Sequence, residues 1–142
     1  MYMCLSCYEI YDRDLIKTSE FDDYNFCPKS NCIGEVVEID ELLIPTIKIL
    51  NQKGYYTKFC CSGHYYGQHP NGYISFEEGI DIPFLPKGFK KEVFNNCVTI
   101  RSTIKDKISK RPSIKDFKTI CNNAKILVEW AISLPYNDEC LV

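Results

Sequence analysis

Four of the nine cysteines in the chain lie within its first 32 residues, at Cys4, Cys7, Cys27 and Cys32. Two residues separate the first pair, four separate the second, and nineteen lie between the pairs. Two close pairs of thiolates joined by a loop are typical of a structural zinc site, in which the metal takes four tetrahedral ligands. The sequence therefore predicts one zinc ion held by all four cysteines. A site closed by four protein ligands leaves no open position for catalysis.

A second group of chemically capable residues lies near the middle of the chain and comprises Cys61, Ser62, Gly63, His64 and His69. Cys61 with His64 as its base is the pairing that thiol-dependent acyl transfer needs. Cys61 with both histidines would instead offer three ligands to a second metal. The amides of Ser62 and Gly63 could hold an anion or another ligand, with His64 as a polar contact. A tight turn with a buried cysteine is the fourth interpretation, and the sequence leaves all four open.

The periodicity of apolar residues predicts the elements that would position both groups. Leu43, Ile47 and Leu50 recur at helical spacing, so we expect a helix over residues 40–53 that begins at Asp40 as its N-cap. Runs of aromatic and β-branched residues predict three strands, and an apolar stripe predicts a long last helix. These strands and the last helix span residues 55–61, 73–77, 97–101 and 114–133, with an extended connection over residues 79–89.

These elements predict an α+β fold in two parts. Residues 1–38 carry the four cysteines around an acidic, aromatic arm. So small a unit would fold largely through metal binding, which contributes on the order of 10 kcal/mol at such sites. In residues 39–142, the first and last helices would cover one small sheet. We therefore expect an N-terminal zinc ribbon followed by a small sheet covered by two helices.

Composition and charge limit the binding partners and the cellular setting that we expect. The 142 residues are 45% hydrophobic and carry a formal net charge of −2, so no global basic field attracts nucleic acid. A local basic cluster over residues 105–118 is more simply a solvated helix face and loop, but it keeps that partner open. No apolar run is long enough to span a membrane, and no signal peptide is visible. Because the cysteines are odd in number and spaced as metal ligands, we expect a reducing, cytoplasmic setting.

Two resemblances involve the middle of the chain. The segment Cys60-Cys61-Ser62-Gly63-His64, followed by Tyr73-Ile74-Ser75-Phe76, resembles a group of small uncharacterised Cys-rich proteins of Gram-positive bacteria and their phages. The same segment is similar to the Ser-Cys-Ser-Gly-Arg loop of tRNA wybutosine-synthesising protein 3, a methyltransferase family. Here His64 replaces the arginine and Cys60 replaces the first serine. This second resemblance implies a ligand-binding role for Cys61, Ser62, Gly63 and His64, but not methyl transfer.

The sequence as a whole favours a cytoplasmic zinc-binding protein that acts as a binding module for a protein or a nucleic acid. The resemblance to phage proteins suggests an inhibitor of a host factor. The alternative is a small metal- or thiol-dependent enzyme centred on the Cys61–His69 loop. In the binding module, the zinc ribbon would supply a rigid platform and the Cys61–His69 loop a contact or ligand site, whereas in the enzyme the same loop would carry the catalysis.

Overall fold

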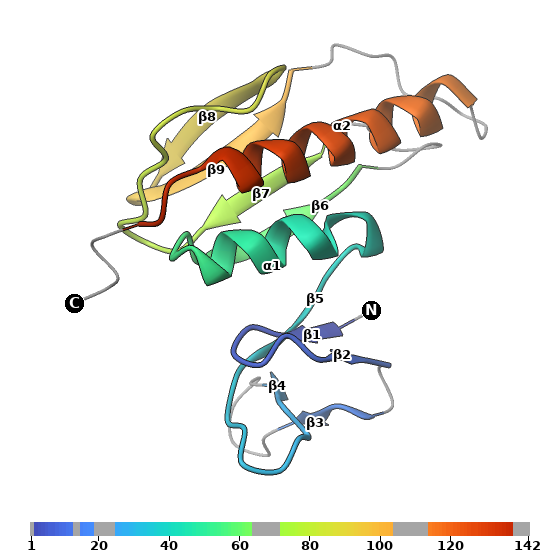
Figure 1. Ribbon diagram of the computed structural model, residues 1–142, viewed down its shortest axis with the longest axis vertical. Coiled ribbons are helices and arrows are strands. Elements are labelled where there is room, and N and C mark those ends of the chain that lie inside the picture. Colours follow the sequence, from blue (N-terminus) through green and yellow to red (C-terminus); the bar gives the residue numbers. More distant parts are fainter. Residues whose placement is uncertain (1, 13–14, 19–24, 64–71, 104–113, 138–142) are drawn as a thin grey trace.

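The computed structural model describes residues 2–12, 15–18, 25–63, 72–103 and 114–137. In these residues, a four-stranded antiparallel sheet carries both α-helices on one face. A smaller unit with its own three-stranded sheet projects from one end of this body (Figure 1). The predicted α+β class is therefore confirmed.

The larger sheet has one buried face and one open face. Its strands are β6 (Thr57–Cys61), β7 (Tyr73–Phe76), β8 (Phe89–Phe94) and β9 (Cys97–Ser102). They lie in the order β6-β7-β9-β8, and all neighbours are antiparallel. Ile74, Phe76 and Ile100 are fully buried, whereas the residues that alternate with them are half-exposed. This period of two is typical of an antiparallel sheet that is packed on one side.

Strand β8 corrects the sequence prediction, which placed an extended connection up to residue 89 and no strand immediately after it. β8 is an outer strand, and Phe89 is its only buried residue. Its sequence therefore lacks the alternation that marks a strand with one packed face. A turn at Asn95 and Asn96, with φ of 50° and 61°, joins it to β9. Such left-handed turns match the twist of a hairpin. The three predicted strands all form, within two residues of their expected bounds.

Both predicted helices are present. A short 3₁₀ turn, η2 (Glu41–Leu43), leads into α1 (Ile44–Gln52), and α2 (Ile114–Ser133) has its predicted bounds. Asp40 precedes the first turn as expected, but its side chain caps no helical amide. Its Oδ2 atom instead accepts a 2.9 Å hydrogen bond from the amide of Ser62. The predicted capping contact is therefore wrong, and Asp40 links the start of the helical segment to the loop after β6.

The C-terminal end of α2 is held by the residue that follows α1. The Nζ atom of Lys53 donates hydrogen bonds to the carbonyl oxygens of Ala131, Ile132 and Leu134, at 2.6 to 3.0 Å. The last carbonyls of a helix have no partner within the helix, and they carry the negative end of its dipole. One ammonium group therefore satisfies three acceptors and ties the two helices together.

We expect Lys53→Met to lower the free energy of unfolding by about 1–2 kcal/mol, because three carbonyls lose a charged donor while the apolar stem is kept. Urea denaturation followed by circular dichroism measures this change. Lys125→Met is the matched control, since Lys125 is exposed on α2 and its side chain makes no ion pair with a described residue. Equal losses in the two variants would argue against a specific role for Lys53.

A three-stranded antiparallel sheet organises the smaller unit, in the order β2-β1-β5. Its strands are β1 (Tyr2–Cys4), β2 (Ile10–Tyr11) and β5 (Val36–Glu38), and a separate pair consists of β3 (Lys17–Thr18) and β4 (Asn25–Phe26). Met3 lies opposite Val37, and Cys4 lies opposite Val36. Met3 and Val37 pack with the main core. Cys4 and Val36 belong to a separate cluster that includes the other three cysteines of the predicted zinc site. The sheet therefore has one face toward the core and the other toward the cysteines.

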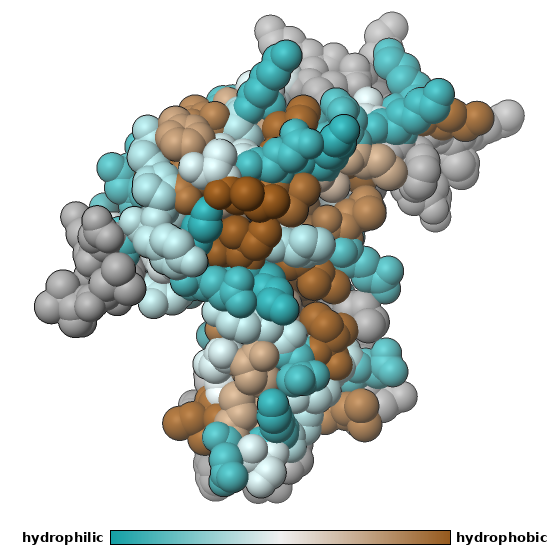
Figure 2. All heavy atoms as spheres, in the orientation of Figure 1, coloured by the Kyte–Doolittle hydropathy of each residue, from teal (hydrophilic) through white to brown (hydrophobic). Residues whose placement is uncertain are grey.

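The main core extends across the predicted boundary between the two parts. It includes Met3 together with Leu43, Leu127 and Trp130, all of which are buried. In the space-filling view, apolar atoms also gather along the line where α1 meets α2 (Figure 2). The division into residues 1–38 and 39–142 stays a prediction, and the shared core shows that the two parts are packed against each other.

Candidate metal centre

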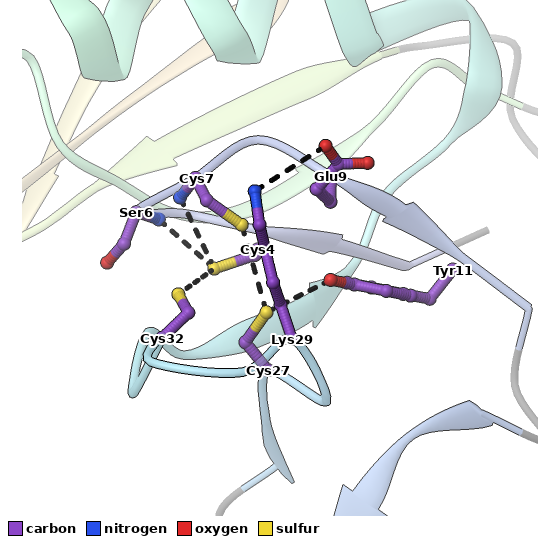
Figure 3. Close-up of polar contacts among 8 residues, drawn as sticks. All are labelled: Cys4, Ser6, Cys7, Glu9, Tyr11, Cys27, Lys29 and Cys32. Carbon is purple, nitrogen blue, oxygen red and sulfur yellow. Dashed lines mark hydrogen bonds and ion pairs between the residues drawn. The ribbon is translucent and has the colours of Figure 1, made fainter.

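Four cysteine side chains converge in the smaller unit (Figure 3). The Sγ atoms of Cys4, Cys7, Cys27 and Cys32 all lie within 4.8 Å of one another. The Cys4–Cys32 and Cys7–Cys27 sulfur pairs are each 3.7 Å apart, far beyond the disulfide bond length of about 2.05 Å. The structure therefore brings the four predicted ligands together in a cluster that can hold a metal ion. In the described part of the chain, no other group of histidines, cysteines and carboxylates has this geometry.

Two tight turns present these sulfurs to one another. In the first turn, the amides of Ser6 and Cys7 lie 3.4 and 3.5 Å from Cys4 Sγ. The second turn, which ends at Cys32, contains Asn31 with a φ of 64°. Asparagine is one of the few residues that adopt this left-handed conformation readily. Each turn supplies two sulfurs from one short segment, and amides directed at a sulfur stabilise the charge of a thiolate.

Tyr11 contributes a polar contact from outside the ligand set. Its hydroxyl oxygen lies 3.1 Å from Cys27 Sγ (Figure 3). Burial favours the neutral thiol of Cys27, but hydrogen bonds from Tyr11, the backbone of Lys29 and the neighbouring cysteines together outweigh it and lower the pKa of Cys27 to about 7. Burial raises the pKa of Cys4 and of Cys7. Of these three thiols, Cys27 therefore ionises at the lowest pH, and metal binding must displace protons from the other two.

Removing the Tyr11 hydroxyl should weaken metal binding. We expect Tyr11→Phe to lower the affinity for Zn²⁺ by about 10- to 100-fold, because outer groups that hydrogen-bond to metal ligands fix their position and charge. Competition with a chromophoric chelator measures this affinity. Tyr2→Phe is the matched control, since Tyr2 also packs against the cysteine cluster and its hydroxyl has no hydrogen bond to a described residue. An unchanged affinity in Tyr11→Phe would show that the contact does not support the site.

Gly34 allows the two turns to approach each other. A Cβ atom at this position would lie 2.6 Å from Cys4 Sγ and 2.6 Å from Ser6 Oγ, and real Cβ contacts essentially never fall below 3.0 Å. The carbonyl oxygen of Gly34 also accepts a 2.9 Å hydrogen bond from the amide of Cys27. A single glycine therefore touches both turns, and the close approach leaves no room for a side chain.

The second predicted group begins at the end of β6, where Cys60 and Cys61 point to opposite faces of the sheet. Cys60 lies opposite Ile74 and packs against the main core, whereas Cys61 lies opposite Tyr73 on the open face. Burial raises the pKa of Cys60 to about 11, and it also raises the pKa of Cys61. Both thiols are therefore protonated at neutral pH, where a nucleophile would need the thiolate.

We expect neither Cys60 nor Cys61 to react appreciably with iodoacetamide near pH 7 under conditions that fully modify free cysteine, because the thiolate is the reacting form. Peptide mass spectrometry of the metal-loaded protein measures the modification at each position. The urea-unfolded protein serves as the control, because the raised pKa values depend on burial and both thiols should then react. Rapid modification of Cys61 in the folded protein would restore the thiol-dependent interpretation.

The amides that were predicted to hold an anion already have acceptors within the chain. The amide of Ser62 donates to Asp40 Oδ2 at 2.9 Å, and the amide of Gly63 lies 3.4 Å from Cys61 Sγ. A bound anion would have to displace a carboxylate from the first of these. His64 and His69 lie outside the described residues, so the second metal site and the histidine base stay predictions.

Sequence reasoning singled out the four cysteines but missed Tyr11 and Gly34. Both residues act on ligands that are distant in the sequence, since Tyr11 contacts Cys27 and Gly34 faces Cys4. In the sequence, the glycine two residues after Cys32 was the one available sign of a close approach between the turns.

Among the described residues, no helix is both long and apolar enough to cross a membrane. Comparison with protein-family models, curated proteins and solved structures finds no match to this chain.

Proposed function

We propose that this protein is a zinc-binding module that recognises another protein in a reducing cytoplasm. The observation that carries the proposal is the cluster of four cysteine sulfurs, which lie within 4.8 Å of one another. Four protein ligands close a metal site, so the metal would stabilise structure rather than bind substrate. The sheet that carries Cys4 also contributes Met3 to the main core. The metal would therefore fix the smaller unit against the larger one.

Zinc fits the spacing of the sulfur atoms. Tetrahedral coordination with Zn–S bonds of about 2.3 Å places neighbouring sulfurs about 3.8 Å apart. The Cys4–Cys32 and Cys7–Cys27 pairs, at 3.7 Å, agree with this spacing. A tetrahedral set of four thiolates also suits iron, so metal analysis has to distinguish the two. The cytoplasmic setting is part of the proposal, because a reducing compartment keeps such thiols available to a metal.

The surface beside the metal centre favours a protein partner over nucleic acid. Glu35, Glu38 and Glu41 are exposed on and around β5, and none forms an ion pair with a described cation. Nucleic-acid binding depends on protein cations that neutralise the phosphates. A surface of carboxylates repels these phosphates. Inhibition of a host factor, which the resemblance to phage proteins suggests, would be one use of such a module.

Metal analysis of the purified protein tests the proposal. We expect elemental mass spectrometry to find one zinc ion per chain, both in the unmodified protein and in His64→Ala. Two zinc ions, the second lost in His64→Ala, would favour a metal-dependent enzyme at the Cys61–His69 loop. Iron in place of zinc, or no metal, would contradict the zinc assignment. Binding of single-stranded DNA or RNA that weakens steeply with added salt would instead favour a nucleic-acid partner.

A further inference from the structure

A groove of about 800 Å³ lies between the smaller unit and the larger sheet. β5 and its flanking residues form one wall, and β6 forms the other together with Tyr73 at the start of β7 and Glu77 just after its end. In the described part of the chain, both β5 and β6 are outer strands of their sheets. Outer strands present backbone N–H and C=O groups that an additional strand can pair with. The groove is therefore bounded by two outer strands, and at the start of β6 the amide of Thr57 already donates to Asn51 Oδ1 at 3.3 Å.

The walls of this groove are acidic. The carboxylates that line it belong to Glu35, Glu38, Asp40, Glu41 and Glu77. Lys58 is the single cation among its described lining residues. The four glutamates are exposed and form no ion pair with any cation that the structure describes. The whole chain has a net charge of only −2, so the groove concentrates negative charge that the rest of the molecule does not share.

Aromatic side chains lie along the same groove. Phe59 on β6 is 61% exposed, and Tyr73 on β7 is half-exposed. Cations of the chain itself already lie over both rings: the guanidinium of Arg101 is 4.8 Å from the centre of Tyr73, and Lys58 Nζ is 5.6 Å from that of Phe59. The apolar stems of lysine and arginine pack well on such rings while their charged ends reach carboxylates. The groove thus combines the two kinds of contact that a basic side chain can make.

We propose that this groove binds an extended, basic segment of a partner protein, which adds a strand to the outer edge of β6. The inference rests on the proposed function, because it names the partner chemistry of the binding module. Main-chain hydrogen bonds to β6 supply affinity, and lysine or arginine side chains meet Glu38 on one wall and Glu77 on the other. The amides of Thr57 and Ser62 already donate to Asn51 and Asp40, so the added segment pairs with the middle of β6, residues 58–60.

Selection from a random nonapeptide library on the immobilised, zinc-loaded protein tests this inference. We expect the selected peptides to be enriched in lysine and arginine and depleted in proline at their centre, since proline cannot donate to a strand ladder. A fluorescent copy of the most enriched peptide should bind the double variant Glu38→Gln/Glu77→Gln about 3- to 10-fold more weakly. Added salt should also weaken its binding to the unmodified protein.

Glu78→Gln is the matched control, because Glu78 is exposed beside Glu77 but does not line the groove. This control should leave peptide affinity unchanged. Full affinity in the double variant, an equal loss in the control, or selection of peptides without basic enrichment would each overturn the inference. Zinc content is measured on the same samples. Protein with one zinc and no basic selectivity contradicts the groove assignment alone, whereas protein without zinc contradicts the proposed function.

Discussion

Replacing Cys4 by serine should remove the metal and unfold the smaller unit. Cys4 is fully buried, and its sulfur lies 3.7 Å from that of Cys32. A neutral serine hydroxyl is a poor substitute for a thiolate ligand, and binding at structural zinc sites contributes on the order of 10 kcal/mol. The smaller unit has only short strands and a small apolar cluster to oppose that loss. We therefore expect most of the zinc to be absent from Cys4→Ser.

Zinc content and urea unfolding measure this effect. For the unmodified protein, free zinc at 100 times its dissociation constant should stabilise the folded state by about 2.7 kcal/mol, whereas Cys4→Ser should not respond. Cys97→Ser is the matched control, because Cys97 is half-buried and lies outside the cysteine cluster. It should retain its zinc. A folded Cys4→Ser variant with its full metal content would disprove the assignment of Cys4 as a ligand.

Gly34→Ala should also disrupt the metal centre, although it changes no ligand. Its Cβ would meet Cys4 Sγ and Ser6 Oγ at 2.6 Å, so the two turns would have to move apart. Sulfurs that are already 3.7 Å apart cannot separate much further and still share one metal. We expect a loss of zinc affinity on the order of 100-fold, the upper end of the effect of disturbing the surroundings of a metal.

Gly88→Ala is the comparison that isolates this steric effect. A Cβ at Gly88 would meet nothing within 4 Å, but the residue has a φ of +81°, so alanine is strained there. This variant should lose stability while zinc affinity stays unchanged, as chelator competition would show. If Gly34→Ala binds zinc as tightly as Gly88→Ala does, the turns have more freedom than the structure indicates.

The elements that the sequence predicted well are those whose local pattern agrees with their packing. The apolar stripe of the last helix places Leu127 and Ala131 in the core, and the helix has its expected bounds. The spacing of the cysteine pairs predicted a cluster because two tight turns allow few other arrangements. Strand β8 was missed because most of its residues face solvent, which gives no alternation to detect.

The contacts that could not be predicted depend on the approach of distant segments. Asp40 has the residue type of an N-cap, yet its carboxylate accepts the amide of Ser62, twenty-two positions away. Tyr11 is one of ten tyrosines, and nothing local to it indicates a contact with Cys27. The acidic groove likewise requires β5 and β6 to face each other, and these strands come from opposite sides of the predicted boundary at residue 38.

The two faces of the small sheet have a consequence for folding during synthesis. All four ligands and all three strands of this sheet lie within residues 1–38. A metal can therefore bind and stabilise the sheet before most of the chain has been synthesised. Met3 and Val37, however, belong to a core completed by Leu127 and Trp130. An early metal-bound intermediate would therefore expose an apolar face until the last helix emerges from the ribosome. Shielding of that face by a chaperone would then matter most in this interval.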